Sequence, residues 1–99
     1  MHSKRNIFKM QRAHLIVHGL VQGVFFRSNA KKAAETLGLR GYARNMADGT
    51  VEVVAEGSKE KIKELIEFCK KGPGAARVDK IDVHIWEARN EFKDFEVRH

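Results

Sequence analysis

The sequence predicts an α+β fold in which two helices cover one face of a mainly antiparallel sheet. The chain has 99 residues, which is enough for one hydrophobic core and too few for two. Apolar residues alternate in some segments and recur every three or four positions in others, so both strands and helices are expected. Their order is strand, helix, strand, strand, helix, strand and a short last strand. This is the split β-α-β, ferredoxin-like sandwich.

The first strand and the first helix follow from residues 13–38. Residues 13–18 alternate between apolar and more polar side chains, which predicts a strand. The apolar positions that come next have helical spacing: Phe26, Ala30, Ala33, Ala34 and Leu37. Gly38 then stands where the C-terminus of a helix favours glycine.

A hairpin and a second helix follow. Asp48-Gly49 separates the strand-like tracts 41–46 and 50–56, and such a dipeptide between two strands is a strong hairpin signal. Ser58 can cap a helix. The apolar stripe of that helix consists of Ile62, Leu65, Ile66 and Cys69.

The last part of the chain adds two strands. Gly72-Pro73-Gly74 ends the second helix, residues 78–86 alternate, and a short strand is expected around Phe95 and Val97. We therefore expect residues 12–99 to form a single domain.

The net charge of +6 at pH 7 is concentrated near the start of the chain. Residues 1–12 contain Lys4, Arg5, Lys9 and Arg12 and no acidic residue, whereas basic and acidic residues nearly balance elsewhere. We expect residues 1–11 to be a flexible, solvated extension rather than a segment that binds an acidic surface. A nucleic-acid-binding face would need basic residues gathered more closely.

Composition excludes several classes of protein. Cys69 is the only cysteine, so neither an intrachain disulfide nor a thiolate metal cluster can form. The apolar runs are far too short to span a membrane, and no signal peptide is recognisable. The five histidines lack metal-ligand spacing, although His18 lies close enough to the following loop to be considered a site neighbour. We expect a cytoplasmic monomer without metal or cofactor.

The expected topology brings two distant tracts together. The first helix crosses over between strands 1 and 2, so these strands must run parallel and end at the same edge of the sheet. One strand end carries the loop of residues 19–25, and the other carries Arg44-Asn45. We therefore expect the two tracts to be neighbours.

The loop has features of an anion-binding site. Backbone N–H groups at a helix N-terminus have no partner within the helix, and glycines allow a ligand to approach them closely. Arg27 follows in the first helical turn, and its guanidinium can bind two phosphate oxygens at once. The alternative is a loop that only makes a tight turn. The predicted phosphate-binding residues are Gly19, Val21, Gln22, Gly23, Val24, Phe25, Phe26 and Arg27.

Asn45 is the second candidate catalytic residue, beside Arg27. A side-chain amide both donates and accepts hydrogen bonds, so it can hold a water molecule in line with a phosphorus atom. The alternative is that Asn45 only initiates the hairpin turn, as asparagine often does. Its expected position opposite the anion loop favours the first interpretation.

At these positions the sequence resembles the acylphosphatase family. Gly19-Leu20-Val21-Gln22-Gly23-Val24-Phe25-Phe26-Arg27 is similar to the phosphate-loop signature of the family. The segment Gly41-Tyr42-Ala43-Arg44-Asn45, followed by Asp48-Gly49-Thr50-Val51-Glu52, is similar to its second signature. The resemblance covers residues 12–98, and two spaced motifs are more specific than one. Tyr42 stands where tryptophan is frequent, and Ala43 stands where valine is common.

The resemblance implies hydrolysis of a small acyl phosphate to a carboxylate and inorganic phosphate, without a metal. Arg27 matches the phosphate-binding arginine of the family, and Asn45 matches the asparagine that orients water. Inorganic phosphate or sulfate would compete for the same site. No side chain in either motif is an obvious general base, so we hypothesise that the phosphoryl group accepts the proton of the water.

The sequence disfavours two other functions. Arg40-Gly41-Tyr42-Ala43 matches the start of an RNA-recognition signature, but Arg44-Asn45-Met46 breaks the match. The motif also falls on the second strand instead of the third, which offers no aromatic platform for bases. A catalytically inactive anion sensor is disfavoured because both Arg27 and Asn45 are present.

Overall fold

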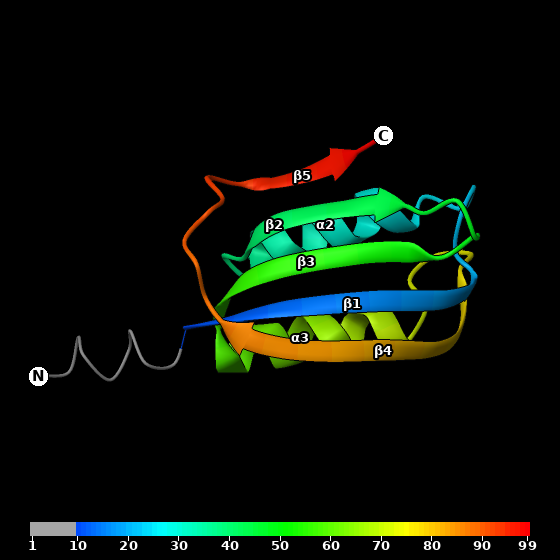
Figure 1. Cartoon of the computed structure of the whole chain (residues 1–99). Coiled ribbons are helices and arrows are strands. Elements are labelled where there is room, and N and C mark those ends of the chain that lie inside the picture. Colours follow the sequence, from blue (N-terminus) through cyan, green and yellow to red (C-terminus); the bar gives the residue numbers. More distant parts are fainter. Residues whose placement is uncertain (1–9) are drawn as a thin grey trace, which may run out of the picture.

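The computed structural model describes residues 10–99 and has the expected α+β architecture (Figure 1). Five strands form one sheet in the order β4-β1-β3-β2-β5, and both helices cover the same face of it. The elements are β1 (Met10–Leu20), α2 (Phe26–Thr36), β2 (Arg40–Asn45), β3 (Val51–Ser58), α3 (Lys59–Lys70), β4 (Arg77–Glu87) and β5 (Phe95–Arg98).

The bounds of the elements agree closely with the expected ones, except at the two ends of β1, which includes Gly19 and Leu20 of the expected loop. This strand begins at Met10, and Met10 and Gln11 already pair with Ser58 and Gly57 of β3. The expected boundary between the N-terminal extension and the domain, after residue 11, therefore falls inside β1. Residues 1–9 of the expected extension lie outside the described residues.

The pairing of the strands fixes the directions that matter for function. β3 pairs antiparallel with both β1 and β2, and β4 pairs antiparallel with β1. Only the β2–β5 pair is parallel. Because β1 and β2 are each antiparallel to β3, they run in the same direction, as predicted. Their last residues, Leu20 and Asn45, thus lie at the same end of the sheet, where both strands have their carboxyl ends.

The hydrophobic core lies between the sheet and the two helices. The strands contribute alternate residues such as Leu15, Val17 and Val53, and the helices contribute Phe26 and Leu65, all of them buried. Burial of this kind is the main favourable contribution to folding.

Cys69 belongs to this core, as expected. It is fully buried, and burial raises the pKa of its thiol to about 12. The thiol is therefore protonated at neutral pH and serves as a small apolar side chain.

The ends of the helices carry the signals that the sequence predicts. At the end of α2, Gly38 adopts a φ of 71°. The N–H of Gly38 donates to the carbonyl of Glu35 (3.0 Å), and the N–H of Leu39 donates to the carbonyl of Ala34 (2.8 Å). These two bonds define a Schellman motif. At the start of α3, the hydroxyl of Ser58 accepts a hydrogen bond from the N–H of Lys61 (3.3 Å).

A buried carboxylate holds the long connection between β4 and β5, which crosses one end of the sheet (Figure 1). Glu56 on β3 is 7% exposed. It accepts hydrogen bonds from the N–H groups of Arg89 (2.8 Å) and Asn90 (2.9 Å), and it pairs with the guanidinium of Arg12 (3.1 Å). Burial alone would raise the pKa of Glu56, but these donors outweigh it and lower the pKa below its usual value.

We predict that Glu56→Ala destabilises the protein by about 1–3 kcal/mol at neutral pH, because buried donors lose their acceptor. Because the pKa of Glu56 is lowered in the folded state, its stabilisation is complete above the unfolded pKa of about 4.3. It is lost as the pH falls through the folded-state pKa. Urea unfolding at neutral and acidic pH should therefore show the difference between wild type and variant shrinking in acid.

Glu64→Ala is the matched control, because Glu64 is an exposed residue on α3 whose only ion pair within residues 10–99 is with Lys61 at 3.6 Å. We expect that change to stay within about 0.5 kcal/mol. Equal unfolding midpoints for the two variants would show that Glu56 is not an anchor.

Candidate active site

A pocket of about 310 Å³ lies where the ends of β1 and β2 meet the start of α2. Its lining residues are Val21, Gly23, Phe25, Phe26, Arg27, Ser28, Asn45, Val97 and His99. The two residues that the sequence selects as catalytic, Arg27 and Asn45, therefore share one pocket. The parallel directions of β1 and β2 account for this proximity.

The N-terminus of α2 faces this pocket without a side-chain cap. Phe25 occupies the N-cap position, makes no capping hydrogen bond, and no acidic residue follows in the first turn. The start of α3 differs, because it has both the Ser58 cap and Glu60 in its first turn. At α2 the unpaired N–H groups and the positive end of the helix dipole can therefore act on an anion in the pocket.

One nitrogen of the Arg27 guanidinium, Nη1, is bound by the C-terminal residues. Its Nη1 donates to the backbone oxygen of Arg98 (2.8 Å) and lies 3.3 Å from Nδ1 of His99. Among residues 10–99, the hydrogen bonds of this guanidinium involve Nη1 alone. Nε and Nη2 therefore keep their N–H groups for an oxygen-bearing ligand.

Asn45 has an unusual buried acceptor. Its Oδ1 atom is buried and accepts no hydrogen bond from any residue in the range 10–99. Buried polar atoms nearly always have a partner, so such an atom suits a donor that the protein itself does not supply. The hairpin turn does not use it, because Asp48 Oδ1 accepts from the N–H (3.0 Å) and the hydroxyl (2.6 Å) of Thr50. Asp48 thus performs the turn role that the alternative interpretation gave to Asn45.

The neighbouring Arg44 fixes the direction of Asn45. Nη2 of Arg44 donates to Oε1 of Glu52 at 2.8 Å, and Nε2 of His14 lies 2.7 Å from the other oxygen of Glu52. Burial of Glu52 works against its ionisation, but His14 and Arg44 outweigh burial and lower the pKa of this carboxyl. Because successive side chains of a strand point to opposite faces, holding Arg44 on the open face directs Asn45 toward α2.

Three predicted phosphate-binding residues, Gly19, Gln22 and Val24, do not line the pocket. Gly19 lies in β1 opposite Val78, and a β-carbon at this position would collide with the backbone oxygen of Arg77. The close approach of β4 therefore explains this glycine.

Gln22 has a role that the sequence did not reveal. Its Nε2 donates to the backbone oxygens of Met46 (2.8 Å) and Thr50 (2.9 Å). The side chain of Gln22 thereby joins the loop before α2 to the hairpin that follows Asn45. Its two hydrogen bonds set the distance between the two halves of the pocket.

His18 does not reach the pocket. Its Nε2 pairs instead with Oδ2 of Asp82 on β4 (2.8 Å). Conversely, Ser28, Val97 and His99 line the pocket although the sequence did not single them out. Val97 and His99 reach the pocket because β5 pairs parallel with β2, with Ala43 opposite Val97 and Arg44 opposite Arg98.

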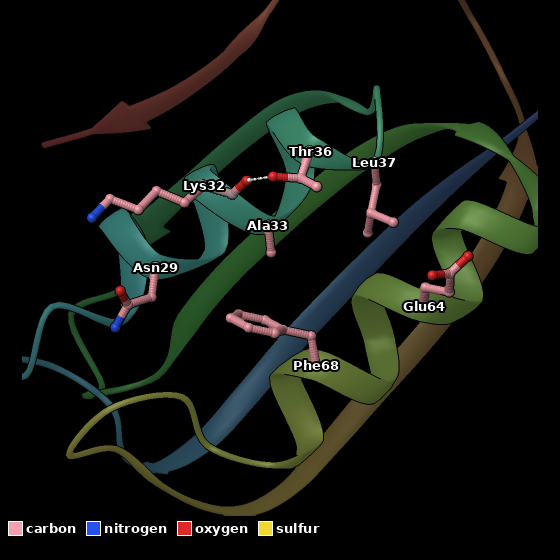
Figure 2. Close-up of a pocket in the computed structure, with 7 residues that line it drawn as sticks. All are labelled: Asn29, Lys32, Ala33, Thr36, Leu37, Glu64 and Phe68. Atoms are coloured by element: carbon pink, nitrogen blue, oxygen red, sulfur yellow. Dashed lines mark hydrogen bonds between the residues drawn. The ribbon is translucent and has the colours of Figure 1, made fainter.

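A larger hollow of about 460 Å³ lies between the two helices, away from these residues. Figure 2 shows Phe68 of α3 pointing toward Ala33 of α2 across this hollow. Its charged lining residues, Lys32 and Glu64, have opposite signs, and it contains neither an arginine nor an uncapped helix start. Its walls are mainly apolar, so it does not suit a phosphoryl group.

Two further findings concern metal ions and membranes. Within residues 10–99, no three His, Cys, Asp or Glu side chains are placed to share a metal ion. None of the described helices is long and apolar enough to cross a membrane. The fold and the pocket together define a small α+β sandwich whose pocket suits a tetrahedral anion.

Comparison with known proteins makes the assignment specific. Residues 13–97 match the family model for acylphosphatase. The acylphosphatase of Methylococcus capsulatus is 46% identical over 88 residues, which cover 89% of this chain and 96% of that protein. The chain belongs to the acylphosphatase family.

Solved structures agree with this assignment. The crystal structure of acylphosphatase from Bacillus subtilis superposes with a TM-score of 0.86 at 30% identity, covering 90% of this chain and 99% of that one. An acylphosphatase from Coxiella burnetii gives a TM-score of 0.85 at 38% identity, with coverages of 91% and 94%.

We predict that Gln22→Ala loosens the loop before α2, because two carbonyl groups lose their donor. A loss of about 1–2 kcal/mol in unfolding free energy is expected from two hydrogen bonds. Amide hydrogen exchange in residues 20–25 should become faster, since local opening no longer has to break these bonds. Gln11→Ala, near the start of β1, is the control, and unchanged exchange in the Gln22 variant would contradict the role.

Proposed function

We propose that this pocket hydrolyses small acyl phosphates by in-line attack of water, without the help of a metal. Membership of the acylphosphatase family makes the chain an enzyme that converts an acyl phosphate into a carboxylate and inorganic phosphate. One observation carries the assignment to this pocket. Arg27 and the uncapped start of α2 lie beside the buried, unpartnered oxygen of Asn45.

In this proposal the phosphoryl group binds at the start of α2. The guanidinium of Arg27 and the backbone N–H groups of the pocket-lining residues before and at the start of α2 hold its three non-bridging oxygens; these residues are Val21, Gly23, Phe25 and Phe26. Phosphoryl transfer depends mainly on positioning and on stabilisation of negative charge, both of which these groups supply. Positive charge from the arginine and the helix dipole takes the place that a metal ion has in other phosphoryl-transfer enzymes.

Asn45 orients the attacking water. Its Oδ1 accepts a hydrogen bond from the water, whose oxygen then faces the phosphorus atom. The new P–O bond forms as the bond to the acyl oxygen breaks, and the electron pair leaves with the carboxylate. A carboxylate is a weak base, so its departure needs no strong general acid.

The proton of the water passes to a phosphoryl oxygen. Besides Arg27, His99 is the titratable side chain that lines the pocket within residues 10–99, and its Nδ1 faces Arg27. We therefore assign no general base to the protein. If the pH–rate profile showed a titration near neutrality that disappeared in His99→Gln, His99 would be the general base.

The remaining expectations are also proposals. Phosphate and sulfate should compete with the substrate, because they present the same tetrahedral oxygens. A monomer is sufficient, since α2, β2 and β5 of one chain supply the pocket. Residues 12–99, together with Met10 and Gln11, form the catalytic domain. A cytoplasmic location remains a prediction that the single, buried cysteine supports.

Binding of RNA is not proposed. The third strand exposes no aromatic residue on its open face, where Glu52 and Glu56 form ion pairs with basic side chains. An RNA-recognition surface of this type needs aromatic side chains at these positions to stack on bases.

We predict that Arg27→Ala lowers kcat/KM for acetyl phosphate by at least about 100-fold, because developing charge on the phosphoryl oxygens loses its main partner. Inorganic phosphate should also stop raising the thermal unfolding midpoint of this variant. The assay is run with a chelator present, and the exposed Arg77→Ala is the control. Loss of wild-type turnover on chelation would overturn the metal-free mechanism.

We predict a different result for Asn45→Ala. Turnover should fall about 100-fold, because the attacking water loses its position. Phosphate should still inhibit and still protect the fold against heat, because Arg27 and the helix start are intact. Asn29→Ala, at the edge of the hollow between the helices, serves as control. Equal loss of turnover and of phosphate binding would make Asn45 a structural residue.

A further inference from the structure

Phe25 is the most exposed large hydrophobic side chain among residues 10–99. It is 80% exposed, compared with 59% for Leu20 and 50% for Trp86. A phenyl ring in this position contributes almost nothing to the hydrophobic core. Its presence at the edge of the pocket therefore requires another reason.

The backbone of Phe25 makes the choice of residue more unusual. Its φ of 62° and ψ of 23° place it in the left-handed region, which costs free energy for any residue with a bulky side chain. The position is held there because its carbonyl accepts from the Ser28 hydroxyl (3.1 Å) and from the N–H of Asn29 (3.0 Å). Glycine or asparagine would suit this conformation better, so the fold alone does not favour phenylalanine.

The location of Phe25 connects it with the substrate. It lines the same pocket as Arg27 and Asn45. In-line attack places the water and the leaving group on opposite sides of the phosphorus atom. Because the oxygen of Asn45 that would hold the water is buried, the acyl group must leave toward solvent, where the ring of Phe25 is exposed.

We infer that Phe25 is the acyl-binding residue of this enzyme and that it makes the enzyme favour acyl phosphates with an aromatic or large apolar acyl group. This inference rests on the proposed function. The phosphoryl half is the same in every substrate, so only groups at the open side of the pocket can distinguish one acyl group from another. Phe25 lines this pocket together with Val97 and His99, its ring is the most exposed of these apolar groups, and aromatic groups associate favourably with an exposed ring.

The test compares benzoyl phosphate with acetyl phosphate in the wild type and in Phe25→Asn. Asparagine tolerates a positive φ, so the variant should fold at least as well as the wild type, which its thermal midpoint checks. We expect the ratio of kcat/KM values, benzoyl over acetyl, to fall about tenfold. The change should appear mainly in the KM for benzoyl phosphate, because the ring contacts the ground state and the transition state alike.

The ratio of the two kcat/KM values reports on recognition of the acyl group alone, because any change in binding of the phosphoryl group affects both substrates equally. Leu20→Asn removes another exposed apolar side chain that does not line the pocket, and its ratio should equal that of the wild type. A ratio within twofold of wild type in Phe25→Asn would overturn the inference. Failure of the wild type to hydrolyse either substrate would instead refute the proposed function.

Discussion

β1 and β2 both pair antiparallel with β3, and this shared neighbour makes them run in the same direction. The rest of the site depends on that constraint. It brings the loop before α2 and the end of β2 to one edge of the sheet, so that Arg27 and Asn45 line one pocket. Neither residue could act on a common ligand if the hairpin had placed the end of β2 at the opposite edge.

Side chains outside the pocket then fix its dimensions. Gln22 joins the loop to the hairpin, and Glu52 holds Arg44 on the open face of the sheet, which directs Asn45 toward α2. Glu56 binds the segment between β4 and β5, and this segment leads the chain to β5 beside the pocket. The groups proposed to contact substrate therefore rest on a surrounding set of hydrogen bonds, as a site that works by positioning requires.

Much of this arrangement follows from the sequence. Alternation and helical spacing predict every element, and the crossover rule predicts that Arg27 and Asn45 meet. The contribution of His99 could not be foreseen, because the partner of a short last strand depends on pairing between distant parts of the chain. The role of the Gln22 side chain likewise depends on carbonyl groups whose directions only the folded hairpin sets. At Gly19 the close approach of β4 alone already requires a glycine, and this contact too depends on the folded sheet.

The bond between Arg27 and the backbone oxygen of Arg98 couples the pocket to β5, the shortest of the five strands in the described sheet. β5 has four residues, lies at an edge and pairs with β2 alone, and such segments open at a lower free energy than the core. Fraying of this strand releases one corner of the guanidinium and removes Val97 and His99 from the pocket wall. We therefore expect inactivation by heat to begin as a local event at this edge, at temperatures where the helices and the central strands are still intact.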